Sequence, residues 1–170
     1  SNIASVVARV RSENPRTMDR IKDYLSKIVP GIEDFYRVPL GPKETIEFKQ
    51  EVKGADHPWR FYGSSMSDGA LRALGALVAV RQLGSADHHV SLVGIEEPET
   101  ALHPAAAGAL MDALSEASEE AQVLITSHSP DLVDHLELGE QDLLVVVSRQ
   151  GTTWIAEADA ASREAIRKHL

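Results

Sequence analysis

Two acidic residues after an apolar run are the first side chains in this sequence that could do chemistry. Residues 90–95 are mostly apolar, and Glu96 and Glu97 follow them. Neighbouring side chains of a strand point in opposite directions, so the two carboxylates can serve different tasks. We expect one of the two to hold a divalent cation and the other to polarise an attacking water molecule.

A histidine follows the next apolar run. Residues 123–126 predict another strand, and Ser127 and His128 come directly after it. If the two strands are neighbours in a parallel sheet, their carboxyl ends meet at the edge where ligands of such sheets bind. His128 would then lie near Glu97 and contact a γ-phosphate or the attacking water. The pattern therefore predicts that His128 and the two glutamates meet at one edge of the sheet; a histidine at a helix start is also a common local hydrogen-bonding group.

A third candidate site opens a predicted helix. Ser67 is a good N-cap residue, and Asp68 and Gly69 follow it. Backbone N–H groups at a helix N-terminus attract anions because the peptide dipoles of the helix are aligned. Residues 67–69 therefore form either an ordinary helix cap, which is the commoner case, or an anion site.

The elements that must position these residues alternate between strand and helix. Apolar runs predict four strands, at residues 90–95, 123–126, 143–147 and 153–157. Helices are predicted at residues 67–84, at residues 104–121 and from Ser129. Because these strands are apolar throughout, the expected fold class is α/β, with a mainly parallel sheet covered by helices on both faces.

Residues 1–62 predict a different kind of segment. Apolar residues recur on one helix face at residues 3–10 and again at 18–28, where Asn14 and Pro15 mark the helix start. Three short β-like runs follow, at residues 33–38, 45–52 and 59–62. Pro and Gly separate these runs, which predicts a small antiparallel meander.

Charge is divided unevenly along the 170 residues. Residues 1–62 hold 11 Lys and Arg against 9 Asp and Glu, whereas residues 63–170 hold 6 against 17. An acidic lobe binds phosphates poorly unless metal ions or a more basic lobe supply positive charge. The sequence has no cysteine, which excludes a disulfide framework, a thiolate metal site and a cysteine nucleophile.

The hydrophobic content of 43% is enough to bury a core, but it is not gathered into a membrane span. No apolar run approaches the roughly 20 residues that cross a bilayer. The N-terminus lacks the basic and apolar regions of a secretion signal. We therefore expect a cytoplasmic protein without a membrane partner.

Four segments, taken together, resemble the C-terminal half of the ABC-type ATPases related to SMC, RecF and OLD proteins. Residues 66–72 look like the signature motif, and residues 91–97 like the Walker B strand with its catalytic glutamate. Residues 99–104 (ETALHP) look like the D-loop, and residues 126–130 are similar to the switch-histidine loop. The four motifs occur in the order and spacing of that family.

The resemblance implies ATP hydrolysis, with ATP and Mg²⁺ as cofactors. It implies Glu97 as the general base, His128 as the sensor of the γ-phosphate and Glu96 as the metal-binding residue. Residues 67–69 would contact nucleotide held by a second subunit, so a homodimer closed around nucleotide is the expected assembly. DNA repair, chromosome maintenance and phage defence are the pathways that the resemblance implies.

Two positions depart from the family pattern. Glu96 stands where an aspartate is common at the metal position, although a Glu-Glu-Pro-Glu form also occurs among OLD-type members. Asp68 replaces the first glycine of the transporter-type signature, which separates the chain from transporter ATPases.

The resemblance also implies a domain organisation. Residues 1–62 would form part of the ATPase head or an arm, and residues 63–170 the C-terminal lobe of a P-loop NTPase of the ABC type. A phosphate-binding loop of the form G-x-x-x-x-G-K-[ST] does not occur in the sequence. In this family that loop, the Walker A motif, lies in an N-terminal lobe. Such a lobe is therefore the expected partner, and the isolated chain is expected to be inactive.

A metal-dependent nuclease or hydrolase is an alternative interpretation of the same residues. It predicts tight binding of Mn²⁺ or Zn²⁺ without nucleotide. The metal ligands would come from two histidines and three carboxylates: Glu96, Glu97, Glu99, His103 and His128.

A non-catalytic dimerisation or DNA-clamp module is a second alternative. Acidic residues are interspersed among the basic ones near the N-terminus, which favours a solvated helix face over a DNA surface. Salt-dependent DNA binding by residues 1–62 would distinguish a DNA surface from a solvated helix face. The basic residues in question are Arg9, Arg11, Arg16, Arg20, Lys22 and Lys27.

Overall fold

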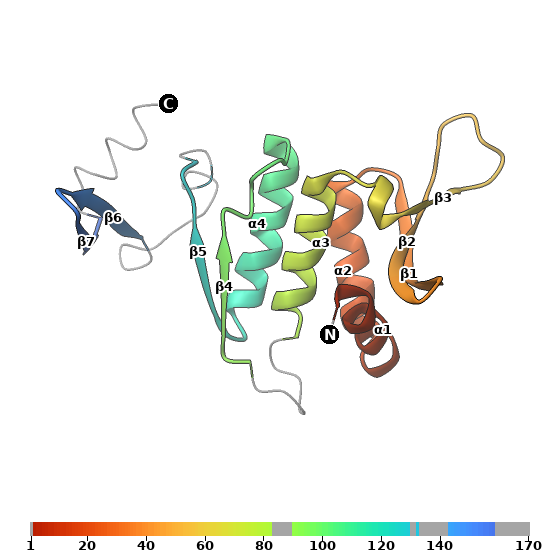
Figure 1. The fold of residues 1–170 in the computed structure, drawn as a ribbon, viewed down its shortest axis with the longest axis horizontal. Coiled ribbons are helices and arrows are strands. Elements are labelled where there is room, and N and C mark those ends of the chain that lie inside the picture. Colours follow the sequence, from red (N-terminus) through yellow and green to blue (C-terminus); the bar gives the residue numbers. More distant parts are fainter. Residues whose placement is uncertain (1, 83–89, 130–131, 133–142, 159–170) are drawn as a thin grey trace. The chain divides into compact units, whose positions relative to one another are not determined.

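The computed structural model describes residues 2–82, 90–129, 132 and 143–158 (Figure 1). The chain divides into two compact units, Ser1–Ser127 and His128–Leu170, and each is described by itself. The boundary predicted between residues 62 and 63 separates sequence segments and stays a prediction. In the described part of the chain, no helix is long and apolar enough to cross a membrane.

Two helices open the first unit, α1 (Ile3–Glu13) and α2 (Pro15–Ile28), and both were predicted. Asn2 and Asn14 cap them, each accepting the backbone N–H three residues further on, at 3.0 and 3.2 Å. The apolar residues of α2 recur with helical periodicity because they form the face of the helix that is buried. Its buried side chains are Met18, Ile21, Tyr24, Leu25 and Ile28.

The predicted antiparallel meander follows α2. Its strands are β1 (Ile32–Leu40), β2 (Lys43–Gln50) and β3 (Trp59–Tyr62), paired in the order β1-β2-β3. Phe35 and Phe48 face each other across β1 and β2 and are fully buried. This pair attaches the meander to the core of the unit.

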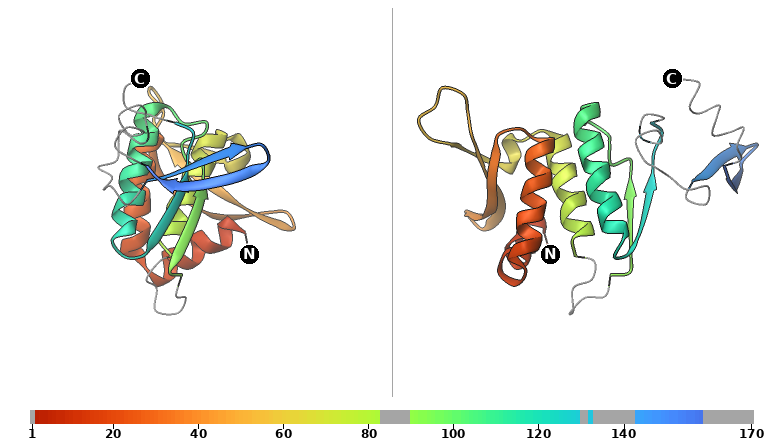
Figure 2. Two further views of the ribbon diagram at one scale, coloured as in Figure 1. Left: turned by 90° about the vertical axis from the view of Figure 1, so that its left-hand side faces the viewer. Right: turned by 180° about the vertical axis from the view of Figure 1, so that it is seen from behind.

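Three helices stand side by side in the centre of the first unit (Figures 1 and 2). After a short 3-10 turn, η1 (Gly63–Ser65), helix α3 (Asp68–Val80) packs against both α2 and α4 (Pro104–Ser118), which also pack against each other. Helix α3 was predicted to reach residue 84 but ends at Val80; residues 83–89 lie outside the described part. The leucines at the centre of this layer are fully buried: Leu25, Leu74, Leu77, Leu110 and Leu114.

Two strands lie beside α4 and pair in parallel, as predicted. They are β4 (Leu92–Glu96) and β5 (Gln122–Thr126), with Glu96 opposite Thr126 at their carboxyl ends. The prediction that helices cover both faces of the sheet is wrong for this pair in the described structure. Leu92 and Leu124 are 51% and 54% exposed, because α3 and α4 cover only one face of this pair in the described structure.

The described part of the second unit is a hairpin of β6 (Leu144–Arg149) and β7 (Thr152–Glu157). Both strands were predicted, but they pair antiparallel through a turn at Gln150 and Gly151, whose φ angles are both positive. The helix predicted from Ser129 falls mostly outside the described residues. The mixed α/β fold is confirmed; among the described strands only β4 and β5 are parallel, and the larger parallel sheet stays a prediction.

Candidate functional site

The candidate site is built on the carboxyl ends of β4 and β5. The Glu97 N–H donates to the Thr126 carbonyl at 2.8 Å and so extends the parallel pairing by one residue. The side chain of Glu96 is exposed, and that of Glu97 is half-buried. The predicted adjacency of the two strand ends is therefore present, with both carboxylates at the tip.

Residues 97–102, here named the Glu97 loop, turn the chain sharply from β4 towards α4. Glu97 and Ala101 have φ angles of 43° and 64°, a left-handed conformation that is unfavourable for residues with a side chain. Thr100 closes the first turn: its N–H donates to the Glu97 carbonyl and its Oγ1 to Glu97 Oε2, both at 3.1 Å. Left-handed non-glycine residues persist where their surroundings hold them, and they are common at functional sites.

A hydrogen bond that the sequence analysis missed joins this loop to β5. The Ser127 hydroxyl donates to Glu99 Oε1. The other oxygen, Glu99 Oε2, is buried and has no hydrogen-bond partner among the described residues. Glu99, the third glutamate of the Glu-Glu-Pro-Glu run, was the residue from which this hydrogen bond could have been predicted. A buried carboxylate needs a hydrogen-bond donor nearby.

The predicted catalytic His128 begins the second unit. Its covalent neighbour Ser127 is fixed at the end of β5 by the bond to Glu99. The approach of His128 to Glu97 stays a prediction.

The segment predicted to contact phosphate lies at the start of α3. Ser67 is the N-cap, and its Oγ accepts the Ala70 N–H at 3.2 Å. Ser67 and Asp68 are exposed, whereas Gly69 is buried against the backbone of Ala101. The three residues thus lie next to the Glu97 loop, and their contact with nucleotide stays a prediction.

The described residues lend no support to a metal cage of protein ligands. No three His, Asp or Glu side chains of the described part are grouped so that they could hold a metal ion. His103 has a structural task, since its Nδ1 accepts the Ala105 N–H at the start of α4, at 3.3 Å. The nuclease or hydrolase alternative therefore has no observation in its favour here.

The basic residues near the N-terminus are largely engaged within the chain. Arg11 pairs with Asp34 at 2.5 Å, and Arg9 donates to Gln82 at 2.8 Å. Lys27 lies over the ring of Tyr24. Groups already paired in this way are poor candidates for DNA phosphates, which weakens the DNA-clamp alternative.

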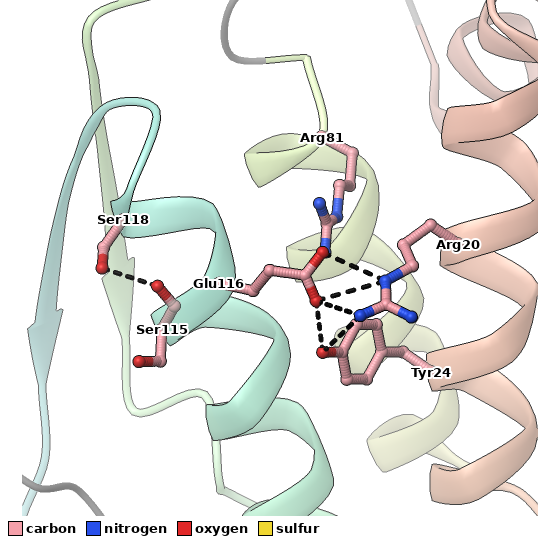
Figure 3. A network of polar contacts seen from close by, with 6 residues as sticks. All are labelled: Arg20, Tyr24, Arg81, Ser115, Glu116 and Ser118. Atoms are coloured by element: carbon pink, nitrogen blue, oxygen red, sulfur yellow. Dashed lines mark hydrogen bonds and ion pairs between the residues drawn. The ribbon is translucent and has the colours of Figure 1, made fainter.

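A polar network at the opposite end of the helices was also missed by the sequence analysis (Figure 3). Glu116 of α4 accepts from Arg20 at 2.5 and 3.0 Å and from the Tyr24 hydroxyl at 2.5 Å, both from α2. Arg81, at the end of α3, lies 2.8 Å from Glu116 Oε1 as an ion pair. The Arg20 hydrogen bonds lower the pKa of Glu116 to about 2, and burial is the main cause that raises the pKa of Tyr24.

Comparison with known proteins bears on both the fold and the family. Residues 7–134 match the family described as "AAA domain, putative AbiEii toxin, Type IV TA system". No curated protein matches the chain. The matched residues include the start of α3, the Glu97 loop and the end of β5.

Solved structures of SMC ATPase heads are similar to the chain. One, from work on ATP-driven dimerization and DNA-stimulated activation of SMC ATPases, has a TM-score of 0.65 at 14% identity, covering 95% of this chain and 94% of that one. The Smc head domain with a coiled coil and joint from Pyrococcus yayanosii has a TM-score of 0.63 at 16% identity, covering 91% and 29%. The SMC head domain from Thermotoga maritima has a TM-score of 0.54 at 14% identity, covering 92% and 52%.

At these identities the structural likeness concerns the fold alone. The chain spans about a third to a half of the two named head domains and nearly all of the first structure. The family match covers well over half of this chain. The chain belongs to this AAA-domain family, and its mixed α/β fold is similar to that of SMC ATPase heads.

Proposed function

We propose that this chain is the C-terminal lobe of an ATP-hydrolysing ABC-type ATPase, with Glu97 as the residue that activates the attacking water. The observation that carries the proposal is the meeting of the β4 and β5 carboxyl ends, where the Glu97 N–H bonds to the Thr126 carbonyl. This places a carboxylate at the edge where parallel sheets bind ligands. The residue before His128 lies at the same edge.

The remaining roles follow from the charge of the site. Residues 96–104 contain three glutamates and neither Lys nor Arg, so a triphosphate would need positive charge from elsewhere. Mg²⁺ held by the exposed Glu96, directly or through water, would supply part of it. An N-terminal lobe carrying the Walker A lysine would supply the rest.

The open face of the β4–β5 pair supports the need for such a lobe. Leu92 and Leu124 are about half exposed, and in the described structure the two strands pair only with each other. A pair of strands is marginal without further strands or a second covering layer. On this proposal the isolated chain is inactive.

Ser67, Asp68 and Gly69 would contact nucleotide held by a second copy of the protein in a dimer. Ser67 and Asp68 are exposed at the helix N-terminus, and their N–H groups and the Ser67 hydroxyl suit an anion. The same segment touches the Glu97 loop through Gly69. Dimer closure would therefore complete the site from both sides.

The test is Glu97→Gln in the full-length protein. Loss of the general base should lower ATP hydrolysis by about 10²–10⁴-fold while MgATP binding is retained. Glu119→Gln, at the exposed end of α4, is the matched control and should hydrolyse ATP at the normal rate. Normal hydrolysis by Glu97→Gln would remove Glu97 from the mechanism.

A further inference from the structure

Gly69, in the first turn of α3, lies against the backbone of the Glu97 loop. It is buried, and a Cβ atom added to it would lie 2.3 Å from the Ala101 carbonyl oxygen and 3.0 Å from the carbonyl carbon. A side chain cannot approach a backbone oxygen so closely. Only glycine lets the loop and the helix come this near.

The loop is held on a second side by Ser127. The Ser127 hydroxyl donates to Glu99, two residues after Glu97. The loop that these contacts hold contains two left-handed residues, Glu97 and Ala101. Such a conformation persists only where the surroundings impose it, so both contacts bear on the direction of the Glu97 side chain.

We infer that Gly69 and Glu99 are positioning residues that clamp the Glu97 loop from two sides and so fix the Glu97 carboxylate for catalysis. The inference rests on the proposed function, because it takes Glu97 as the residue that activates water. On this inference, the contact between Gly69 and Ala101 links the nucleotide-contacting segment, residues 67–69, to the general base Glu97 within one chain. A displacement of the start of α3 would move Ala101, and with it the loop that begins at Glu97.

The experiment is Gly69→Ala in the full-length protein, with Gly75→Ala as the matched control. Gly75 lies in the same helix, and a Cβ atom added to it meets nothing within 4 Å. Because the loop must shift to admit a methyl group at position 69, kcat for ATP hydrolysis should fall about tenfold or more in Gly69→Ala. The change in KM for ATP should be smaller than the fall in kcat, since a misplaced base affects the chemical step. Gly75→Ala should keep both constants.

A second pair of variants tests the other side of the loop and serves if Gly69→Ala does not fold. Ser127→Ala removes the donor to Glu99 and should lower kcat in the same way. Ser127→Thr keeps the hydroxyl and should restore kcat, which a role in bulk packing would not produce.

The outcomes separate the inference from the proposed function. If Glu97→Gln is inactive while Gly69→Ala and Ser127→Ala keep normal kcat, the inference fails and the proposed function stands. A raised KM with normal kcat in Gly69→Ala would show that Gly69 acts through nucleotide contact alone and would overturn the positioning role. Normal hydrolysis by Glu97→Gln would overturn the proposed function itself.

Discussion

Helices α3 and α4 are held differently at their two ends. Both begin beside the Glu97 loop, and both end beside Glu116. At the C-terminal end, both oxygens of Glu116 have partners, which come from α2 and from the end of α3. At the N-terminal end, the loop contains two left-handed non-glycine residues, and Glu99 Oε2 is buried without a hydrogen-bond partner in the described structure.

The two ends of the helices therefore differ in kind: side-chain contacts join the helices at Glu116, whereas the backbone is strained in the Glu97 loop. A network in which one carboxylate binds side chains from two other helices fixes the spacing of three helices, although Arg81 Nε is buried without a hydrogen-bond partner among the described residues. Backbone strain and exposed acids gather at the other end, where we propose the chemistry. Unfavourable backbone conformations and unpaired buried polar atoms at a site are tolerated because the rest of the fold is stable enough to hold them. Substitutions at each end test this difference separately.

The largest effect on stability is expected at the Glu116 end. Glu116→Gln removes the charge that Arg20 and Arg81 share, and it should lower the free energy of unfolding by about 1–2 kcal/mol after allowance for solvent screening. Chemical denaturation measures this loss. Glu119→Gln, three residues on and exposed, should change stability by less than about 0.5 kcal/mol. Equal losses in the two variants would remove the contrast between the two ends.

The same carboxylate predicts a dependence on pH. The pKa of Glu116 in the folded protein, about 2, lies below its ordinary value of 4.5. Its contribution is therefore fully present above pH 4.5 and is lost as the pH falls towards 2. The gap in unfolding free energy between wild type and Glu116→Gln should be constant at neutral pH and should narrow on acidification. A gap that does not change between pH 6 and pH 3 would contradict the network as described.

A smaller effect is expected at the start of α3, where two roles of Ser67 can be separated. Ser67→Ala loses the cap on the Ala70 N–H and should cost about 1 kcal/mol of stability. Ser67→Asp keeps a capping oxygen and should retain stability, but its negative charge would repel phosphate. Both variants should lose ATP-dependent dimerisation, measured by light scattering. Dimerisation of Ser67→Asp at the normal ATP concentration would exclude a nucleotide contact at this position.

Local patterns were sufficient for most elements of the fold. The meander, the helices α1 to α4 and the strands β4 to β7 were all predicted, because helix caps, Pro and Gly turns and apolar periodicity act over a few residues. The parallel pairing of β4 with β5 followed from the same alternation. The burial of that pair was overestimated, since an apolar strand does not reveal whether a second layer covers it within the same chain.

The site was predictable in its residues but not in its contacts. The strand-end position of Glu96 and Glu97 and the N-cap role of Ser67 can be inferred from neighbouring letters. The contact of Gly69 with Ala101 and the bond from Ser127 to Glu99 join positions 32 and 28 residues apart, and no local pattern specifies such pairs.

Sequence patterns were enough to predict which segments are helices and strands and that two acidic residues stand at the end of β4, because these features depend on interactions between near neighbours. Tertiary structure alone decided that the start of α3 lies against the Glu97 loop and that one carboxylate joins three helices at the other end. Those contacts depend on how closely the packed elements approach each other. The closest, between Gly69 and Ala101, is possible because Gly69 has a hydrogen where other residues have a Cβ atom.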